Sequence, residues 1–199
     1  MNLIVISELF PPEETSTAYI MGEITKTLSD KYNVTIVCGP EVYDQNKLTV
    51  LPKSSLIAGV TTIRVKGIKE NKANKLSRIR KFLLMSWRLY KASKKVINKG
   101  DKVLLVSNPF PLLILMAFHR KKMDYEISFL AHDLFPEPLL MRFKLPNLVY
   151  RQCLNIFNRS YARMDKIISL GRDMTDVLRE KTMPYNPNLE IIQIENWGD

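Results

Sequence analysis

The pair His132-Asp133 contains the side chains best placed for catalysis in this sequence. It directly follows the mostly apolar run 128–131, which is typical of a buried strand, and it continues into a Leu-Phe-Pro-Glu turn. Polar residues at the end of a buried strand often line a functional site, and histidine is the commonest group in proton transfer. A lone histidine is more often structural, so the strand-end position and the adjacent aspartate carry the hypothesis. The other histidine, His119, lies in a basic run at 119–122, where we expect it to be exposed.

Five hydroxyl and amide side chains in two loops are candidates for substrate binding: Thr15, Ser16, Thr17, Ser107 and Asn108. The first loop precedes an expected helix, whose amino end could bind a phosphate or a sugar hydroxyl. A hydroxyl at this position equally serves as a helix cap. The second loop contains Pro109 and Pro111, and its stiffness suits either a pocket wall or a plain turn.

Several common sites are absent from the sequence. Neither the Gly-x-Gly-x-x-Gly fingerprint nor the P-loop pattern occurs, so a self-sufficient dinucleotide or P-loop site is not expected. The Gly-x-Ser-x-Gly elbow of esterases is also missing. Cys38 and Cys153 lie far apart without metal-ligand spacing, and we expect no disulfide, no metal site and no cofactor.

The elements that position these residues alternate between strand and helix patterns. Strands are predicted at 2–7, 33–38, 61–66, 102–107, 126–131, 166–170 and 190–194, and helices at 17–31, 74–98, 111–120, 147–163 and 173–181. The polar stretch 45–59 is predicted as a loop. This alternation predicts one α/β domain with a Rossmann-like, doubly wound, mostly parallel sheet, and a ligand crevice at the carboxyl ends of the strands.

The charge surplus of the chain is concentrated in one predicted helix. The chain has a net charge of +10, and residues 69–102 hold twelve Lys or Arg against two acidic residues. At about 100° per residue, a narrow apolar stripe is expected to face the core. The stripe consists of Leu76, Ile79, Leu83, Trp87, Tyr90 and Ile97. Basic side chains fall on the opposite arc: Arg80, Lys81, Arg88, Lys91, Lys95, Lys99 and Lys102.

The basic arc is either a solvated helix face or a surface that contacts an anionic membrane. In the second case Arg80, Lys81, Arg88, Lys91, Lys95 and Lys99 are the expected contacts. Nucleic acid is not expected as a partner, because no recognised motif accompanies the charges and the aromatic residues are predicted on the buried side. No run is apolar for long enough to cross a bilayer. A cytoplasmic protein, peripheral to the inner face of the membrane, is the expectation.

Five short motifs occur in the order in which they stand in family 4 glycosyltransferases, which have the GT-B fold. They are Phe10-Pro11-Pro12-Glu13, Ser107-Asn108-Pro109, the segment from His132 to Glu137, the turn from Ser169 to Met174, and Asn196-Trp197-Gly198-Asp199. The last motif resembles the hinge that joins the two halves of those enzymes. The chain therefore resembles their N-terminal, acceptor-side half, with a domain at 1–194, the start of a hinge at 195–199, and a nucleotide-binding half outside this sequence.

The resemblance implies a retaining glycosyltransferase that needs no metal. It would move a sugar from a nucleotide donor, expected to be UDP-linked, to a lipid-linked glycan acceptor in the synthesis of capsule or O-antigen. His132 would hydrogen-bond the donor sugar or its leaving phosphate, and Asp133 would orient it or contact the acceptor. The isolated chain is expected to be inactive. The alternative is a non-catalytic binding or membrane-docking module with the same fold.

Overall fold

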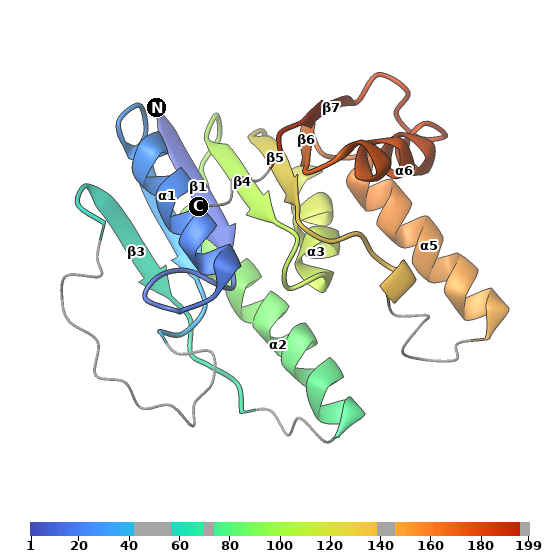
Figure 1. Ribbon diagram of the computed structural model, residues 1–199, viewed down its shortest axis with the longest axis horizontal. Helices are drawn as coiled ribbons and strands as arrows, with labels where there is room; N and C mark the ends of the chain where they lie inside the picture. Colours follow the sequence, from blue (N-terminus) through green and yellow to red (C-terminus); the bar gives the residue numbers. More distant parts are fainter. Residues whose placement is uncertain (42–56, 70–73, 139–145, 196–199) are drawn as a thin grey trace.

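The computed structural model describes residues 1–41, 57–69, 74–138 and 146–195, which build an α/β structure around one sheet (Figure 1). The sheet contains seven strands in the order β3-β2-β1-β4-β5-β6-β7. Their bounds are β1 Asn2–Ser7, β2 Asn33–Cys38, β3 Val60–Arg64, β4 Lys102–Val106, β5 Glu126–Ala131, β6 Lys166–Ser169 and β7 Glu190–Gln193. All neighbouring strands are parallel, which confirms the predicted Rossmann-like sheet.

The helices are α1 Ser16–Ser29, α2 Lys75–Ser93, α3 Pro111–Arg120, α5 Asn147–Tyr161 and α6 Arg172–Thr182. Local sequence explains where they begin. The Thr15 hydroxyl accepts a hydrogen bond from the amide of Ala18 at 3.2 Å, and the Asn74 side chain accepts one from the amide of Leu76 at 2.9 Å. Pro111 opens α3, where its missing N–H is not needed.

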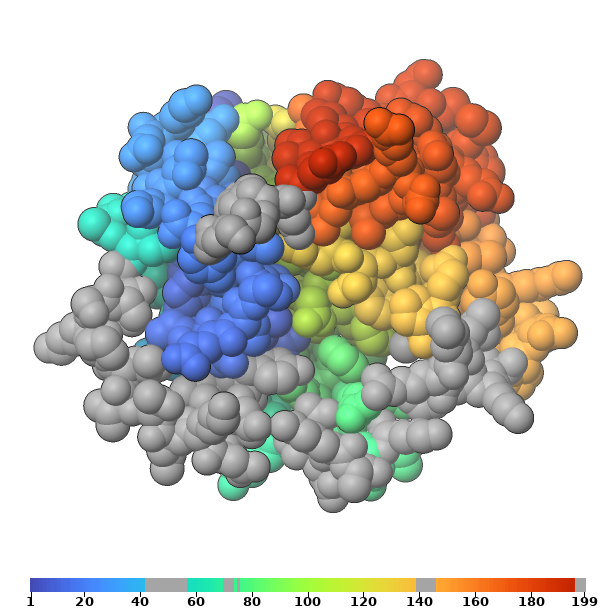
Figure 2. Space-filling model, in the orientation of Figure 1, coloured from blue at the N-terminus to red at the C-terminus, as the bar shows by residue number. Residues whose placement is uncertain are grey.

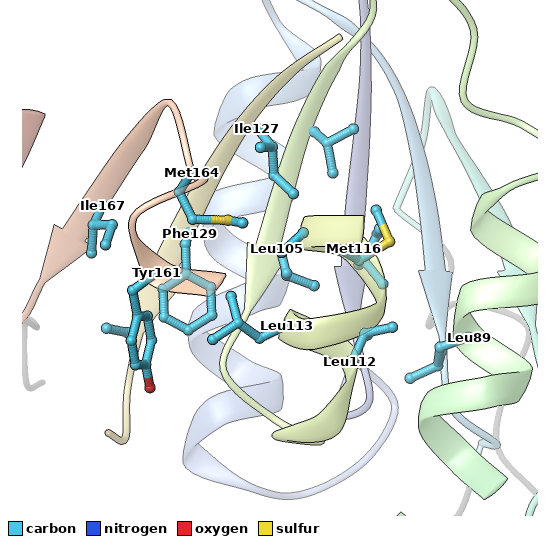
Figure 3. Packing of buried hydrophobic residues seen from close by; sticks show 14 of the residues in the cluster. Leu89, Leu105, Leu112, Leu113, Met116, Ile127, Phe129, Tyr161, Met164 and Ile167 are labelled. Carbon is cyan, nitrogen blue, oxygen red and sulfur yellow. The ribbon is translucent and has the colours of Figure 1, made fainter. Parts of the chain in front are cut away.

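The two faces of the sheet are covered unequally. Successive side chains of a strand point to opposite faces, and they form two separate cores. On one face Met21, Ile24 and Leu28 of α1 pack against the strands. On the other face the buried side chains of α2, α3, α5 and α6 join those of the strands, as Figure 3 shows for Leu112, Leu113 and Met116 beside Leu105 and Phe129. The second core is the larger.

The order and type of the predicted elements are confirmed, with small shifts at their ends. The helix predicted to reach Asn98 ends at Ser93, and the strand predicted at 61–66 spans Val60–Arg64. Most of the predicted loop 45–59 lies outside the described residues, and so does the predicted hinge start at 195–199 except for Glu195.

The burial predicted for α2 is wrong in its first turns. Leu76 and Leu83 are 75% and 55% exposed, and Ile79 and Trp87 are exposed as well. In Figure 1 the amino end of α2 lies beyond the carboxyl ends of the strands, so its first turns have no strand side chains to pack against. The helix instead buries Met85 and Leu89.

His119 is also placed differently from the prediction. It is only 3% exposed, although basic residues follow it. Its Nδ1 atom lies 3.2 Å from the Tyr125 hydroxyl, and its ring meets the ring of Tyr90 edge-on. The helix face that carries Met116 toward the core carries His119 as well. The basic residues next to His119 in the sequence therefore led to a wrong prediction of its exposure.

Candidate functional site

The carboxyl edge of the sheet is where the predicted site residues gather. Along the chain, β2 and β3 are added on one side of β1, whereas β4 to β7 are added on its other side. β1 and β4 are neighbours in the sheet. Loops that leave such a pair of strands diverge to opposite faces and leave a crevice between them. Glu8 follows β1, Ser107 and Asn108 follow β4, and His132 follows β5. The amide of Glu8 donates to the carbonyl of Asn108 at 3.4 Å, so the first two loops are in contact.

Ser107 fixes the turn that carries the histidine. Its hydroxyl oxygen accepts hydrogen bonds from the backbone amides of both His132 and Asp133, each at 3.2 Å. Ser107 itself is buried. The structure thus brings together three of the residues selected from the sequence, and the contacts of Ser107 are those of a positioning residue for the His132-Asp133 turn.

The environment of His132 favours the neutral form of its imidazole. Burial lowers the pKa of His132 below its ordinary value, and the neighbouring Asp133 opposes this shift. The Nε2 atom is buried, and no residue in the described part of the chain hydrogen-bonds it. A buried nitrogen without a protein partner is costly unless a ligand or water satisfies it. Asp133 is exposed at the same turn.

An aromatic cluster supports the far end of the turn. The Tyr161 hydroxyl accepts a hydrogen bond from the amide of Phe135 at 3.0 Å and donates to the carbonyl of the same residue at 3.3 Å. The ring of Phe135 stacks on Phe110 at 4.6 Å between centroids, and Phe157 packs against both rings. Because Tyr161 and Phe157 belong to α5 and Phe110 directly precedes α3, the turn packs against the larger core.

A buried ion pair at the end of β1 was not predicted. Glu8 and Lys81 have side chains that are 1% and 5% exposed, and their charged atoms lie 4.0 Å apart. Lys81 comes from α2, so the pair links this helix to the first loop of the crevice. The strand-end position of Glu8 was a signal that could have found it, whereas Lys81 was assigned to the exposed arc of α2 and that assignment is wrong.

The loop after β1 is held in place by Arg64. Arg64 at the end of β3 donates from its guanidinium to the carbonyls of Pro11 at 2.5 Å and of Gly39 at 3.4 Å. Thr15 caps α1, which confirms the capping interpretation for this residue. Ser16 is exposed and Thr17 half-buried at the same helix end. They remain predicted substrate contacts.

The basic residues of α2 and the segment after it divide into two groups. Lys81 is buried, and Arg88 donates to the carbonyls of Lys66 and Gly67 at 2.7 and 2.9 Å. Lys99 lies 3.8 Å from Asp124. Arg80, Lys91 and Lys95 are exposed, and Lys91 lies over the ring of Trp87. The exposed residues retain the geometry that a surface contact requires, and Lys99 is one of them because its side chain is 82% exposed.

Within the described ranges, no group of three or more His, Cys, Asp or Glu side chains could hold a metal ion. Across the same residues, no helix has the length and hydropathy required to cross a membrane.

Glu137 at the end of the His132 turn accepts a hydrogen bond from Lys181 of α6.

Comparison with curated proteins finds a relative in sequence. No protein-family model matches the chain. It is similar to the probable glycosyltransferase WbjE of Pseudomonas aeruginosa, with 24% identity over 202 residues, which cover 99% of this chain and 48% of that protein. The chain thus spans about half the length of the curated relative that it matches.

Solved structures share the fold. The N-terminal domain of trehalose-6-phosphate phosphatase from Candida albicans superposes with a TM-score of 0.67 at 11% identity, over 100% of this chain and 49% of that chain. The α,α-trehalose-phosphate synthase (UDP-forming) of Burkholderia vietnamiensis gives 0.56 at 10% identity, over 98% and 48% of the two chains. The chain is therefore similar in sequence to a probable glycosyltransferase, the class that its motifs predicted, and it shares its fold with about half of each of these two solved chains.

Proposed function

We propose that this chain is the acceptor-side, N-terminal half of a retaining glycosyltransferase. The enzyme moves a sugar from a UDP-linked donor to a lipid-linked glycan during the synthesis of a surface polysaccharide such as capsule or O-antigen. The observation that carries the proposal is the His132 turn. Burial lowers the pKa of its imidazole, its buried Nε2 has no partner among the described residues, and Ser107 fixes its backbone at the carboxyl edge of the sheet.

The role of His132 follows from its protonation state. A neutral imidazole with a free ring N–H donates a hydrogen bond to an oxygen that gains negative charge, and such a donor is already oriented before the reaction begins. In a retaining front-face transfer the leaving phosphate takes the proton of the acceptor hydroxyl. His132 then contributes by positioning and charge stabilisation, without acting as an obligatory base.

We propose that the nucleotide-sugar donor binds mainly to a second half of the enzyme, which lies outside this sequence. The synthase of Burkholderia vietnamiensis that shares the fold is named as UDP-forming, which supports UDP as the carrier. In this chain the helix after β1 begins with a threonine cap, where a phosphate-binding loop would need glycines. We therefore place the groups that hold the nucleotide in a second half, joined through the segment that follows residue 194.

The catalytic proposal is tested by His132→Ala in the intact enzyme, with UDP release from a panel of UDP-sugars as the readout. We expect kcat to fall by about a hundredfold or more, as happens when a donor to a developing oxyanion is removed. The melting temperature should change little, because no described residue depends on the Nε2 atom.

The exposed Asp30→Asn substitution on the opposite side of the molecule is the control and should leave kcat unchanged. If His132→Ala keeps the wild-type rate and melts at a lower temperature, His132 is structural and the proposed role is wrong.

The lipid-linked acceptor requires the enzyme to reach a membrane, and α2 is the proposed contact. Its exposed apolar side chains are Leu76, Ile79, Leu83, Leu84 and Trp87. Beside them Arg80, Lys91 and Lys95 are exposed. An exposed apolar stripe with basic neighbours is the pattern of a helix that lies in the membrane interface. This surface differs from the predicted basic arc, because the apolar side chains take part and Lys81 and Arg88 do not. We propose that it docks on the inner face of the cytoplasmic membrane.

Vesicle sedimentation tests the docking surface. The chain should sediment with vesicles that contain anionic lipid, and the triple substitution of Arg80, Lys91 and Lys95 by Gln should weaken binding more than about a hundredfold, at ~1 kcal/mol for each charge. The Leu83→Ser and Trp87→Ser substitutions should weaken it further at high salt, where apolar contacts are not screened.

A matched control removes the same number of positive charges elsewhere, by replacing the exposed Lys26, Lys31 and Arg179 with Gln. The control should bind nearly as well as the wild type. Equal loss in both variants would show that net charge, and not the α2 surface, determines binding.

A further inference from the structure

One turn of α2 contacts both of the loops that border the His132 turn. Lys81 pairs with Glu8 in the loop after β1, with 4.0 Å between their charged atoms. The ring of Phe82, the next residue, lies 5.2 Å from the ring of Phe110 in the loop after β4. Figure 2 shows the green atoms of α2 directly below the yellow-green and yellow atoms of the segments that follow β4 and β5. This turn is therefore a point of contact between α2 and the carboxyl edge of the sheet.

The backbone of Glu8 connects the loops that follow three neighbouring strands. Its amide donates to the carbonyl of Asn108 after β4 at 3.4 Å, and its carbonyl accepts from the amide of Gly39 after β2 at 3.0 Å. The fit at Gly39 is tight, because a Cβ atom there would lie 2.4 Å from the Glu8 carbonyl oxygen. A shift of Glu8 would therefore move Asn108 and the adjacent Ser107, whose hydroxyl accepts from the amide of His132.

The burial of the pair is a costly way to hold a helix. The side chains of Glu8 and Lys81 are 1% and 5% exposed. Removing two charges from water carries a large penalty, and the attraction between them often does no more than offset it. Apolar side chains hold α2 without that penalty, as the buried Met85 and Leu89 do one and two turns further along the helix. A buried ion pair instead restricts how two elements approach each other, because each charge needs the other at short range.

We propose that Glu8 and Lys81 are positioning residues for the His132 turn. Their ion pair fixes the loop after β1 to α2. The backbone of Glu8 extends this position to Asn108, and the neighbouring hydroxyl of Ser107 extends it to the turn that carries His132. Neither charge needs to touch a substrate for this role.

An aromatic contact links the same turn of α2 to the His132 turn. The ring of Phe110 lies between Phe82 and Phe135, at 5.2 and 4.6 Å from their centroids, and Phe135 belongs to the turn. The neighbours Arg80 and Leu83 are exposed and belong to the proposed membrane contact. The ion pair thus sets the position of the turn relative to the helix that meets the membrane. The inference rests on the proposed function only in treating the turn as catalytic.

Histidine titration of the 199-residue chain tests the proposal without a measurement of activity. The double substitution of Glu8→Gln with Lys81→Met removes one charge of each sign and keeps similar side-chain volumes. NMR signals of the imidazole C–H groups report the pKa of each histidine, and His132→Gln assigns them. In the double variant the pKa of His132 should rise toward its ordinary value of 6.5, by more than the error of the fit, because a loosened turn exposes the ring to water. The pKa of His119 should stay unchanged.

An exposed ion pair of α6 supplies the matched control. Asp176→Asn with Arg179→Met removes the same charges and should change neither pKa. An unchanged pKa of His132 in the folded double variant overturns the proposal. A rise for both histidines overturns it as well, because it shows a general loosening of α2. If the double variant does not fold, Glu8→Asp takes its place, since it keeps both charges and widens the gap between them, with the same expected direction and the same contradicting outcomes.

The activity of the intact enzyme separates positioning from stabilisation. Exchange of a buried ion pair for neutral side chains of similar volume often leaves stability unchanged, so the double variant should melt close to the wild type. Its kcat should nevertheless fall about tenfold or more, while KM for the UDP-sugar stays within about twofold. A wild-type kcat would contradict the positioning role. The titration needs no turnover, so an intact enzyme that transfers no sugar would contradict the proposed function alone.

Discussion

At the scale of single residues, the hydroxyl of Ser107 has the largest influence on the candidate site. One oxygen accepts from two successive backbone amides, those of His132 and Asp133. These two hydrogen bonds therefore fix the backbone conformation of the turn that follows β5. The sequence indicated Ser107 as a substrate contact, yet its oxygen is occupied and its side chain is buried. A serine can bind a substrate or bind the loop that does so, and sequence alone does not distinguish the two.

Ser107→Ala should destabilise the chain by ~1–3 kcal/mol, because two part-buried amides lose their acceptor. In the intact enzyme kcat should fall as well, since the turn that carries His132 is released. Urea unfolding measures the first effect. Ser29→Ala, whose hydroxyl bonds an exposed carbonyl in α1, is the control and should stay within ~0.5 kcal/mol. Equal changes in both variants would contradict the assigned role of Ser107.

At the scale of elements, the sequence predicted which helices and strands exist but not which helix faces are covered. Helical spacing correctly placed Leu76, Leu83 and Trp87 on one stripe of α2. It could not show that this stripe faces away from the core, as Trp87 does between the buried Met85 and Leu89, or that the amino end of α2 reaches past the sheet (Figure 1). Lys81 was assigned to the solvated arc for the same reason, since its burial partner Glu8 is remote in sequence.

The strands were easier to predict than the helix faces. A fully buried parallel strand is apolar on both sides, so Leu104 or Phe129 signals a strand whichever face it joins. The candidate site was predicted where it depends on strand ends, as for His132. It was missed where it depends on contacts across the fold, as for the hydroxyl of Tyr161 on Phe135.

The burial of His119 in α3 predicts that the stability of the fold depends on pH. Burial first, then the nearby Lys94 and Lys122, lower the pKa of His119 below its ordinary value of 6.5. The unfolded chain therefore takes up a proton at a higher pH than the folded chain. The free energy of unfolding should be fully retained above 6.5 and should fall as the pH drops below it.

His119→Gln removes this group and can still approach the Tyr125 hydroxyl. The loss of melting temperature between about pH 7.5 and about pH 5.5 should be smaller in the variant than in the wild type. The remaining dependence includes His132, whose pKa is lowered in the same direction. An identical loss in both proteins would show that His119 does not contribute.

At the scale of the whole molecule, we propose that the carboxyl edge of the sheet forms one wall of a site. It offers a histidine, hydroxyls and an aromatic support, but the loop after β1 carries Thr15, Ser16 and Thr17 where a phosphate-binding loop would need glycines. A chain that spans about half of its longer relative is expected to share its site with the other half.

The isolated chain should therefore fold without binding the nucleotide tightly. Isothermal titration with UDP should show no binding with a Kd below about 1 µM. The intact enzyme, titrated under the same conditions, should bind UDP more tightly than the isolated chain. Sub-micromolar binding by the 199-residue chain alone would show that the nucleotide site lies in this half and would contradict the proposed division.

The central position of β1 has a consequence for synthesis on the ribosome. β1 is the first strand to be made, but one of its two neighbours is β4, so that Leu3 pairs with Lys102. The Asn2 side chain likewise cannot donate its hydrogen bond to Asp101 until that residue, 99 positions later, has been made. At about 5–20 residues per second, one edge of β1 stays unpaired for roughly 5 to 20 seconds. The nascent chain therefore carries an open sheet edge during this time, and chaperone binding or aggregation competes with the arrival of β4.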